Sequence, residues 1–415
     1  EPGCWGAIKV SDGTSVLFIP QHPASHAAWL GPIKPAEWFQ RAYEVDAAVC
    51  MERSNSIANF LAHELKAKAI LAPFGKNRDS GMNASLPAFD IVGMESIPQH
   101  LEASVALHEE LAETRVVKSA DEVEVMQFAN DVTSQAHVCV MQQTLSWGSA
   151  REHLAASTFR YEAARRGCLD LGYPPICPTG ARNSYLHYGH AGEPNSEPIV
   201  EDSLTLRDMG ASYHGYHADV TCSYPVSGAF TSKQLLVYEA VLLALEEVKR
   251  SVKPGVSYKD LHHLAQRVML QFMTTNGLFT GDIDEMMESG LMHHFMCHGV
   301  GHALGLDVHD VGGYEPGKSR EPSVRENLRF GRELREGMVV TVEPGFYFND
   351  YLMQEALADT SISGFIVKQR LQELQDVGGV RLEDNIVVTG DGCRVLTSVP
   401  RVASDIEEVM RGGRW

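Results

Sequence analysis

The chain has 415 residues, a hydrophobic fraction of 44% and 36 glycines, a composition typical of an ordinary globular protein of two or three domains. Its formal net charge of -19 argues against a nucleic-acid partner, because contacts to phosphate need a basic surface. No apolar run approaches the roughly 18 residues that a membrane-spanning helix needs, so we expect no membrane partner.

Eight cysteines are scattered along the chain without a CxxC pair. This usage is typical of reduced thiols and differs from a disulfide framework or a zinc ribbon. We therefore expect a cytoplasmic protein whose partners are a small substrate or metal cations.

The first part of the chain predicts a small α/β domain. Two strand-like runs, residues 5–10 and 15–20, flank an Asp-Gly turn, which is the signature of a β-hairpin. A helical stretch over residues 54–66 follows. We place this domain at residues 1–113.

The rest of the chain predicts an α+β domain over residues 114–415. Ser119 and Glu122 have capping-box spacing at the start of a long amphipathic helix, and Thr231 and Gln234 repeat the pattern later. Two blocks of helices are each followed by a strand-rich region, a pattern that favours a domain built from two related halves.

Three histidines, His298, His302 and His309, fall within twelve residues of a glycine-rich stretch. Glycines let the backbone turn tightly and approach a ligand, so these imidazoles can converge on one point. A glycine-rich loop that carries surface histidines explains the segment equally well. Carboxylates elsewhere in the chain must decide between the two interpretations.

Asp208 and Asp219 lie in two strand-like runs joined by a tight connection. If the turn centres near Tyr213-His214, the two carboxylates face each other on one side of a hairpin. Like charges in that arrangement destabilise a sheet unless a cation lies between them. The apolar neighbours favour this buried hairpin over two unrelated surface aspartates.

Glu343 and Glu383 have similarly apolar surroundings. Glu343 ends a buried-strand pattern at a Pro-Gly break, and Glu383 shares one strand face with Arg381 by period-two alternation. A salt bridge to Arg381 explains Glu383 equally well. With the two aspartates and one histidine, these acids form an oxygen-rich set that suits two divalent ions, with Mn²⁺ favoured over Zn²⁺ or Co²⁺.

Several strings of the sequence together resemble the pita-bread metallopeptidases. They are Asp208-Met209-Gly210, Asp219-Val220-Thr221, His298-Gly299-Val300-Gly301-His302, His309-Asp310-Val311-Gly312-Gly313-Tyr314, Thr341-Val342-Glu343-Pro344-Gly345 and Gly379-Val380-Arg381-Leu382-Glu383. Within that group the chain is similar to the eukaryotic prolidases, the Xaa-Pro dipeptidases, over essentially its whole length. The resemblance implies a pita-bread catalytic domain preceded by a smaller α/β domain. It also implies an incomplete first domain, because family members usually carry further amino-terminal sequence.

The resemblance also implies a role for individual residues. It assigns metal binding to Asp208, Asp219, His302, Glu343 and Glu383, catalysis to Glu343, His309 and His298, and substrate binding to His187, Arg329, Arg381, Tyr173 and Trp29. Asp208 would bind one ion, His302 and Glu343 the other, and Asp219 and Glu383 both. Arg329 would clamp the terminal carboxylate of a dipeptide, and Trp29 would be presented to the neighbouring site of a homodimer.

The implied activity is hydrolysis of Xaa-Pro dipeptides by attack of a water that bridges two divalent ions. Glu343 would take and return a proton, while His309 and His298 would stabilise the developing oxyanion and position the substrate. An aminopeptidase P, which releases the first residue from longer X-Pro peptides, is the alternative enzyme. A pita-bread protein without catalysis that serves as a binding module is the alternative from another class.

Overall fold

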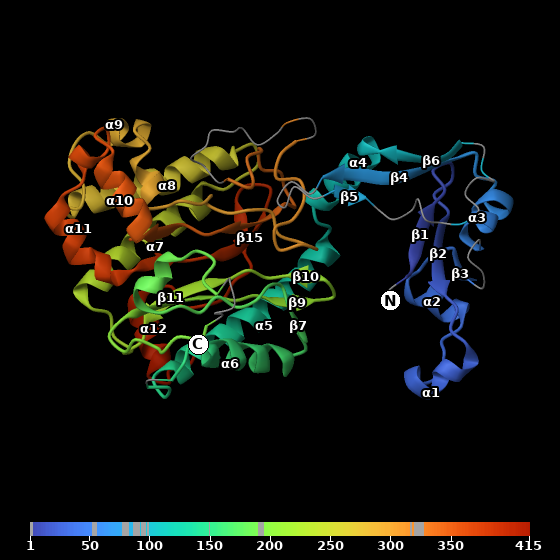
Figure 1. Cartoon of the computed structure of the whole chain (residues 1–415), viewed down its shortest axis with the longest axis horizontal. Helices are drawn as coiled ribbons and strands as arrows, with labels where there is room; N and C mark the ends of the chain where they lie inside the picture. The colour runs from blue at the N-terminus through green and yellow to red at the C-terminus, as the bar shows by residue number, and fades with distance from the viewer. Residues whose placement is uncertain are drawn as a thin grey trace. The chain divides into compact units, whose positions relative to one another are not determined.

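The computed structural model describes residues 3–51, 56–76, 83–85, 92, 97, 99–148, 150–189, 195–315, 318 and 328–415. The chain folds into two compact units, Glu1–Leu111 and Ala112–Trp415, which are seen in Figure 1. All eight cysteines are free thiols. Among the described residues, no helix combines the length and the apolar character needed to cross a bilayer.

The amino-terminal unit contains the predicted hairpin. Strand β1 pairs antiparallel with β2, and β2 pairs parallel with β3. Phe18 packs edge to face against Phe60, with ring centroids 5.7 Å apart, in the small core of this unit. The elements are β1 (Trp5–Ile8), β2 (Ser15–Pro20), α1 (Ala27–Leu30), α2 (Ala36–Ala42), β3 (Ala47–Met51), α3 (Ser56–Asn59), β4 (Ala69–Lys76), β5 (Asn83–Ser85) and β6 (Gln99–Ser104).

Helix α4 leads into the second unit, where helices and short antiparallel strands alternate in blocks. The helices are α4 (Val105–Val116), α5 (Ala120–Thr144), α6 (His153–Ala164), α7 (Ser232–Ser251), α8 (Tyr258–Thr275), α9 (Ile283–Glu288), α10 (Asp350–Ala358), α11 (Lys368–Leu374) and α12 (Ala403–Met410). The strands are β7 (Asp170–Leu171), β8 (Leu204–Asp208), β9 (Ala211–Tyr213), β10 (Tyr216–His217), β11 (Thr221–Pro225), β12 (Val339–Val342), β13 (Gly345–Tyr347), β14 (Gly379–Arg381), β15 (Asp384–Val388) and β16 (Cys393–Val395).

Two of the long helices begin at the predicted capping boxes. The Ser119 side chain accepts from the Glu122 backbone at the start of α5, and Thr231 and Gln234 form the same reciprocal pair at the start of α7. Each box satisfies backbone N–H groups that the first helical turn leaves without partners. The sequence therefore fixes where these two helices begin.

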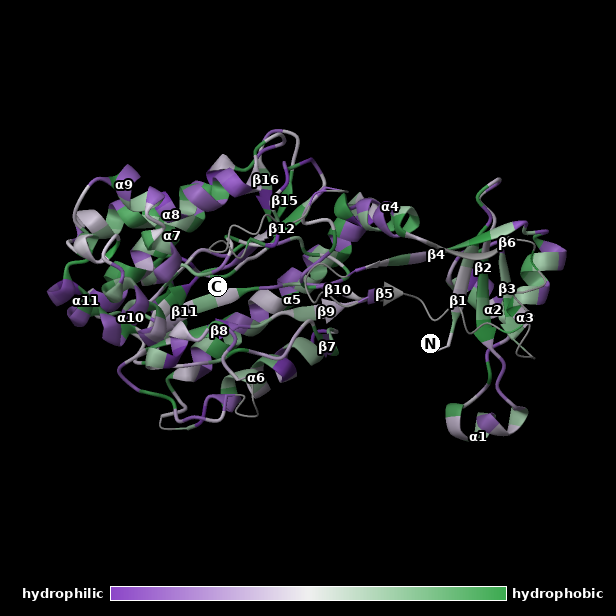
Figure 2. Cartoon of the chain, turned by 45° about the horizontal axis from the view of Figure 1, so that its top comes forward, coloured by the Kyte–Doolittle hydropathy of each residue, from purple (hydrophilic) through white to green (hydrophobic). Residues whose placement is uncertain are grey.

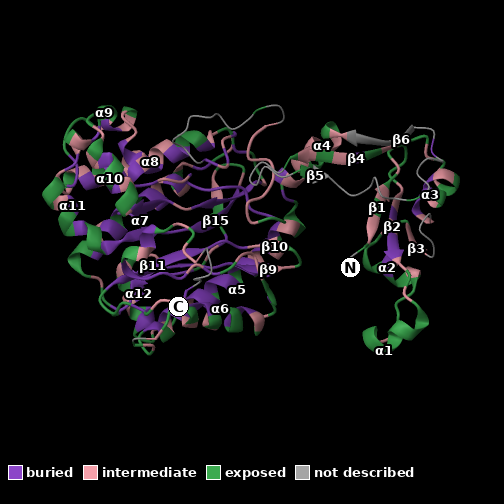
Figure 3. Ribbon diagram, viewed as in Figure 1, coloured by how far each residue is buried: buried purple, intermediate pink, exposed green. Residues whose placement is uncertain are grey.

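The central strands of this unit are buried on both faces. Every residue of β8, β11, β12 and β15 is buried, and Figure 3 shows β11 and β15 in the colour of the buried class. In Figure 2, β8 and β11 lie between α6 on one side and α7 with α8 on the other. Strands that are covered on both faces appear in the sequence as continuous apolar runs. A charged residue at the end of such a strand therefore lies at the edge of the core.

Candidate metal and active site

Each of the four predicted acids lies at the end of a buried strand. Asp208 is the last residue of β8, Asp219 stands two residues before β11, Glu343 directly follows β12 and Glu383 directly precedes β15. The strands pair as β8 with β11 and β12 with β15. Strand pairing thus brings the acids together two by two, and the bond from the Glu383 N–H to the Thr221 carbonyl, at 3.1 Å, joins the two pairs.

The hairpin that carries the two aspartates has a register different from the predicted one. Tyr213 pairs with Tyr216 and Asp208 with Thr221, so the turn centres on His214-Gly215 and not on Tyr213-His214. His214 and Gly215 both have positive φ, of 47° and 81°, which a tight hairpin turn requires. Asp208 and Asp219 are consequently diagonal neighbours, but they remain on the same face.

His302 is held beside β12 by the backbone. The Thr341 N–H donates to the His302 carbonyl at 2.9 Å, and a Cβ on Gly301 would lie 2.2 Å from the Thr341 oxygen. The His302 Nδ1 lies 2.9 Å from the Ala303 carbonyl and donates to it, so Nε2 is the nitrogen that can donate to an acid or, once deprotonated, bind a cation. His302 is 3% exposed, so the interpretation of this segment as a loop of surface histidines is wrong.

The Nε2 atom of His302 faces the acids. It lies 3.3 Å from Asp219 Oδ2 and 3.6 Å from Glu343 Oε1. Asp219, His302 and Glu383 each offer a ligand atom, and these atoms all lie within 4.8 Å of one another. Carboxylate oxygens and an imidazole nitrogen at these separations suit a divalent cation.

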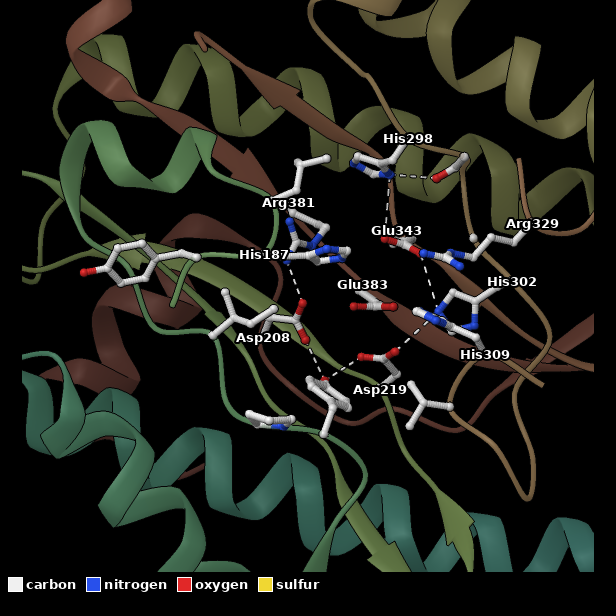
Figure 4. Close-up of a pocket in the computed structure, with 18 of the residues that line it drawn as sticks. His187, Asp208, Asp219, His298, His302, His309, Arg329, Glu343, Arg381 and Glu383 are labelled. Atoms are coloured by element: carbon white, nitrogen blue, oxygen red, sulfur yellow. Dashed lines mark hydrogen bonds and ion pairs between the residues drawn. The ribbon is translucent and has the colours of Figure 1, made fainter. Parts of the chain in front are cut away.

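A cavity of about 430 Å³ opens onto this cluster. Figure 4 shows the labelled side chains converging on it from several separate segments of the chain. The predicted residues that line it are Tyr173, His187, Asp208, Asp219, His298, His302, His309, Arg329, Glu343, Arg381 and Glu383. Trp29 belongs to helix α1 of the amino-terminal unit, where it is 86% exposed.

Arg381 pairs with an aspartate. Its Nη2 donates to Asp208 at 2.6 Å, its Nη1 to Tyr347 at 3.0 Å and its Nε to Thr221 at 3.2 Å. The Thr221 hydroxyl in turn donates to Glu383 at 2.7 Å. A salt bridge to Arg381 is therefore not what fixes the Glu383 side chain.

Three residues of this network were not predicted from the sequence. Tyr347 lies between Arg381 and His298, Thr221 contacts Glu383, and Asn385 accepts from the Asp219 N–H at 2.9 Å. Thr221 and Asn385 each stand two residues after a predicted acid, and Tyr347 stands four residues after one. Period-two alternation would have identified Thr221 and Asn385 as facing the site, whereas Tyr347 lies in β13, beyond the break at Pro344.

Tyr173 bridges the two aspartates. Its hydroxyl lies 2.6 Å from Asp208 Oδ1 and 2.5 Å from Asp219 Oδ1. A phenol has one proton, which it can donate to either carboxylate. Burial, followed by the charges of the two aspartates, raises the pKa of Tyr173 well above its usual range and keeps the phenol protonated.

Burial dominates the electrostatics of three of the four acids, whereas Asp219, although buried, has its pKa lowered by the hydrogen bond from His302. It raises the pKa of Asp208 to about 6 against the opposing charge of Arg381, and it raises the pKa of Glu343 to about 7 against the opposing charge of His302. Burial and then the charge of Asp219 raise the pKa of Glu383 well above its usual range. Acids that resist ionisation in this way gain most from a nearby cation.

The pKa values of the three histidines shift in opposite directions. The hydrogen bond to Asp219 raises the pKa of His302 to about 9 in spite of burial. Burial lowers the pKa of His298 to about 3 and that of His309 to about 4. His298 and His309 are therefore neutral at pH 7, and each can donate or accept one hydrogen bond.

Lowering the pH is expected to destabilise the protein through His137, which is buried in α5 with its Nε2 3.0 Å from the Met209 carbonyl. Burial lowers the pKa of His137 to about 4. The unfolded chain takes up this proton near pH 6.5 and the folded chain only near pH 4, so the free energy of unfolding falls between these values by about 3 kcal/mol. H137Q removes the titrating group and should lose this part of the pH dependence, measured by urea unfolding in EDTA. If the stability of wild type and H137Q depends equally on pH, this role of His137 is contradicted. H153Q, which replaces an exposed histidine, is the control.

A buried set of carboxylates and one imidazole, supported by paired strands of an α+β unit, defines a metallopeptidase with the pita-bread fold. The chain belongs to metallopeptidase family M24, whose model matches residues 124–390. The model described as "Aminopeptidase P, N-terminal domain" matches residues 1–70. The resemblance and the fold predicted from the sequence are confirmed, and the family together with the ligand cluster supports binding of divalent metal ions.

Relatives of two kinds match nearly the whole chain. The Xaa-Pro dipeptidase of Homo sapiens is 41% identical over 414 residues, which cover 99% of this chain and 82% of that protein. A probable Xaa-Pro aminopeptidase of Talaromyces marneffei is 33% identical and matches 97% of this chain and 83% of that protein. Among solved structures, the Pseudomonas aeruginosa aminopeptidase PepP has a TM-score of 0.79 at 28% identity and covers 99% of this chain and 86% of its own. Escherichia coli aminopeptidase P with the inhibitor Pro-Leu has a TM-score of 0.76 at 26% identity, with coverages of 97% and 83%.

Proposed function

We propose that this chain is a metal-dependent dipeptidase that hydrolyses Xaa-Pro dipeptides. The observation that carries the proposal is one cavity lined by the acids, His302 and the guanidinium of Arg329. An ion site and a group that can bind a terminal carboxylate thus face the same small space. The relatives named Xaa-Pro dipeptidase, at 41% identity, support the same activity.

Five side chains fit the ions of such an enzyme by their chemistry. Asp208 would bind one ion, His302 and Glu343 the other, and Asp219 and Glu383 both. The donor set is rich in oxygen, which favours Mn²⁺, with Zn²⁺ and Co²⁺ as alternatives. When bound, the ions supply Lewis acidity that makes water nucleophilic at neutral pH and polarises the scissile carbonyl.

The protein's own residues move the proton and hold the substrate. Glu343, whose pKa burial raises to about 7, accepts a proton and returns it to the leaving nitrogen. His309 is neutral and lines the cavity beside His302, with ring centroids 4.5 Å apart, so its N–H can stabilise a developing oxyanion. His298 lies 2.7 Å from the Gly299 carbonyl and 2.8 Å from the Tyr347 hydroxyl, so we assign it to positioning rather than to proton transfer.

Recognition relies on the free ends of the substrate, because the X-Pro bond has no N–H to donate. His187, Tyr173 and Arg381 line the same cavity as Arg329 and complete the substrate site in this proposal.

R329A should raise the KM for Ala-Pro by roughly 30- to 100-fold, the equivalent of about 2–3 kcal/mol from charge-assisted hydrogen bonds. Steady-state kinetics with metal analysis measure it, and an unchanged KM would remove Arg329 from the site.

The competing activity is that of an aminopeptidase P, which the structural relatives carry in their names. Comparing kcat/KM for Ala-Pro and Ala-Pro-Ala, with and without added Mn²⁺, separates the two. A dipeptidase prefers Ala-Pro, whereas faster release of alanine from Ala-Pro-Ala would overturn the proposal. Failure to cleave either peptide with any divalent ion would favour a non-catalytic binding module.

We further propose that the protein is a cytoplasmic homodimer. Its eight free thiols suit a reducing compartment. Trp29 is 86% exposed on α1, as a residue presented to a neighbouring copy must be. Light scattering gives the oligomeric state, and W29A tests whether this side chain affects the KM for Ala-Pro.

A further inference from the structure

The backbone on both sides of Arg329 is fixed by a neighbouring loop. The Gly331 N–H donates to the Gly313 carbonyl at 2.8 Å, and the Tyr314 hydroxyl donates to the Leu328 carbonyl at 2.7 Å. A Cβ on Gly313 would lie 2.1 Å from the Arg329 carbonyl oxygen, so the two backbones are in direct contact. The segment that carries Arg329 is therefore placed by the loop at Gly313 and Tyr314.

Alternation along the same segment sets the direction of the Arg329 side chain. Leu328 and Phe330 are buried in the core, and Phe330 packs edge to face on Tyr258 with ring centroids 5.1 Å apart. The side chain between them lines the cavity. Because Leu328 and Phe330 are both anchored in the core, the distance that the Arg329 guanidinium extends into the cavity depends on the position of the backbone at this residue.

One buried arginine ties this segment and the loop to helix α4. Arg332 is 7% exposed, and its Nη1 donates to the Gly312 carbonyl at 3.0 Å. The same guanidinium binds Glu113 of α4 through two bonds, at 2.8 Å to Oε1 and 3.0 Å to Oε2. Such a bidentate pair fixes orientation as well as distance. Val116 of α4 also packs on Gly312, where a Cβ would lie 2.1 Å from its Cγ2 atom.

We propose that Glu113 and Arg332 are positioning residues that hold Arg329 at the distance needed to bind the terminal carboxylate of the substrate. The inference rests on the proposed function of Arg329. A long arginine side chain loses much conformational freedom on binding, and a preorganised backbone reduces that cost. Misplacement of a substrate-positioning group by about 1 Å can cost on the order of 10²-fold in rate.

The test compares a substrate that has a terminal carboxylate with one that lacks it. E113Q keeps the size of the side chain but removes the charge that holds Arg332. We expect kcat/KM for Ala-Pro to fall about tenfold through KM, while kcat/KM for Ala-prolinamide, kcat and metal content stay within twofold of wild type. A purely structural defect would lower the values for both substrates.

Two further variants make the result interpretable. R329A is the reference, and its effect must be confined to Ala-Pro, since equal loss on the amide would defeat the proposed function of Arg329 itself. R335Q is the matched control: Arg335 also donates to Glu113, at 3.3 Å, but its side chain is 51% exposed. R335Q should behave as wild type.

The remaining outcomes of the test concern only the pair of Glu113 and Arg332. If R329A discriminates between acid and amide but E113Q does not, the positioning role is overturned while the proposed function stands. Should E113Q fail to fold, R332K provides the second variant, because it keeps the charge but loses the bidentate geometry. R332K is expected to show the same carboxylate-specific loss, and the double variant E113Q/R329A should be no worse on Ala-Pro than R329A.

Discussion

E343Q is expected to turn over Ala-Pro about 10³-fold more slowly than the wild type, with a KM within a few-fold. Glu343 lies at the end of β12, 3.6 Å from His302, and burial raises its pKa to about 7, near the operating pH of a proton carrier. A group of this kind contributes about 10²- to 10⁴-fold to a rate. Glutamine preserves the shape and the oxygen donor but cannot take up the proton. Steady-state kinetics at saturating Mn²⁺ give the measurement.

Metal analysis of the same samples separates the two roles of this glutamate. If E343Q retains its ions and loses turnover, the loss belongs to proton transfer; if it loses ions in proportion, the loss belongs to ligation. E373Q, at an exposed glutamate paired with Arg370, is the control for an unrelated loss of a carboxylate. A kcat within tenfold of wild type would defeat the assignment of Glu343 as the base.

E383Q is expected to stabilise the metal-free protein and to weaken its stabilisation by Mn²⁺. Burial and the charge of Asp219 hold the pKa of Glu383 well above its usual range. Ionisation of this group in the folded protein is therefore unfavourable, and a neutral isostere should raise the free energy of unfolding in EDTA at pH 8 by about 1–3 kcal/mol. Urea unfolding with EDTA and with Mn²⁺ measures both effects.

The pH dependence distinguishes this cause from a packing effect. A carboxyl whose folded pKa is raised contributes its stability below the unfolded pKa, near 4.5, and loses it as the pH rises toward the folded pKa. The gain from E383Q should thus be small at pH 4 and grow toward pH 8. E373Q, at an exposed glutamate paired with Arg370, should stay within about 0.5 kcal/mol of wild type at every pH. A gain from E383Q that does not vary with pH would refute the explanation.

Much of the site could be predicted because its residues stand at interruptions of apolar runs. Glu343 ends a buried strand at Pro344, and His302 lies among glycines that the fold requires: Gly301 has no room for a Cβ against Thr341. Burying a polar or charged side chain in apolar surroundings costs free energy unless it is hydrogen-bonded, paired or bound to a metal, so such positions point to a site. The capping boxes at Ser119 and Thr231 are equally local, so they fixed two helix starts.

What depends on register or on long-range contact could not be predicted in the same way. The turn of the aspartate hairpin lies one residue later than predicted, with His214 at a positive φ that few non-glycine residues adopt and that the sequence pattern does not reveal. The bonds of Arg381 to Asp208 and Tyr347 join segments far apart in sequence. Choosing Asp208 over Glu383 as its partner needs the three-dimensional arrangement.

The raised pKa values of Asp208, about 6, and Glu343, about 7, have a consequence for how the enzyme is activated. Loading the site is an exchange reaction, since protons held by these acids must leave for cations to enter. Acidification would then return protons to these acids and displace the ions, and neutralisation in the presence of free cation would reverse the exchange.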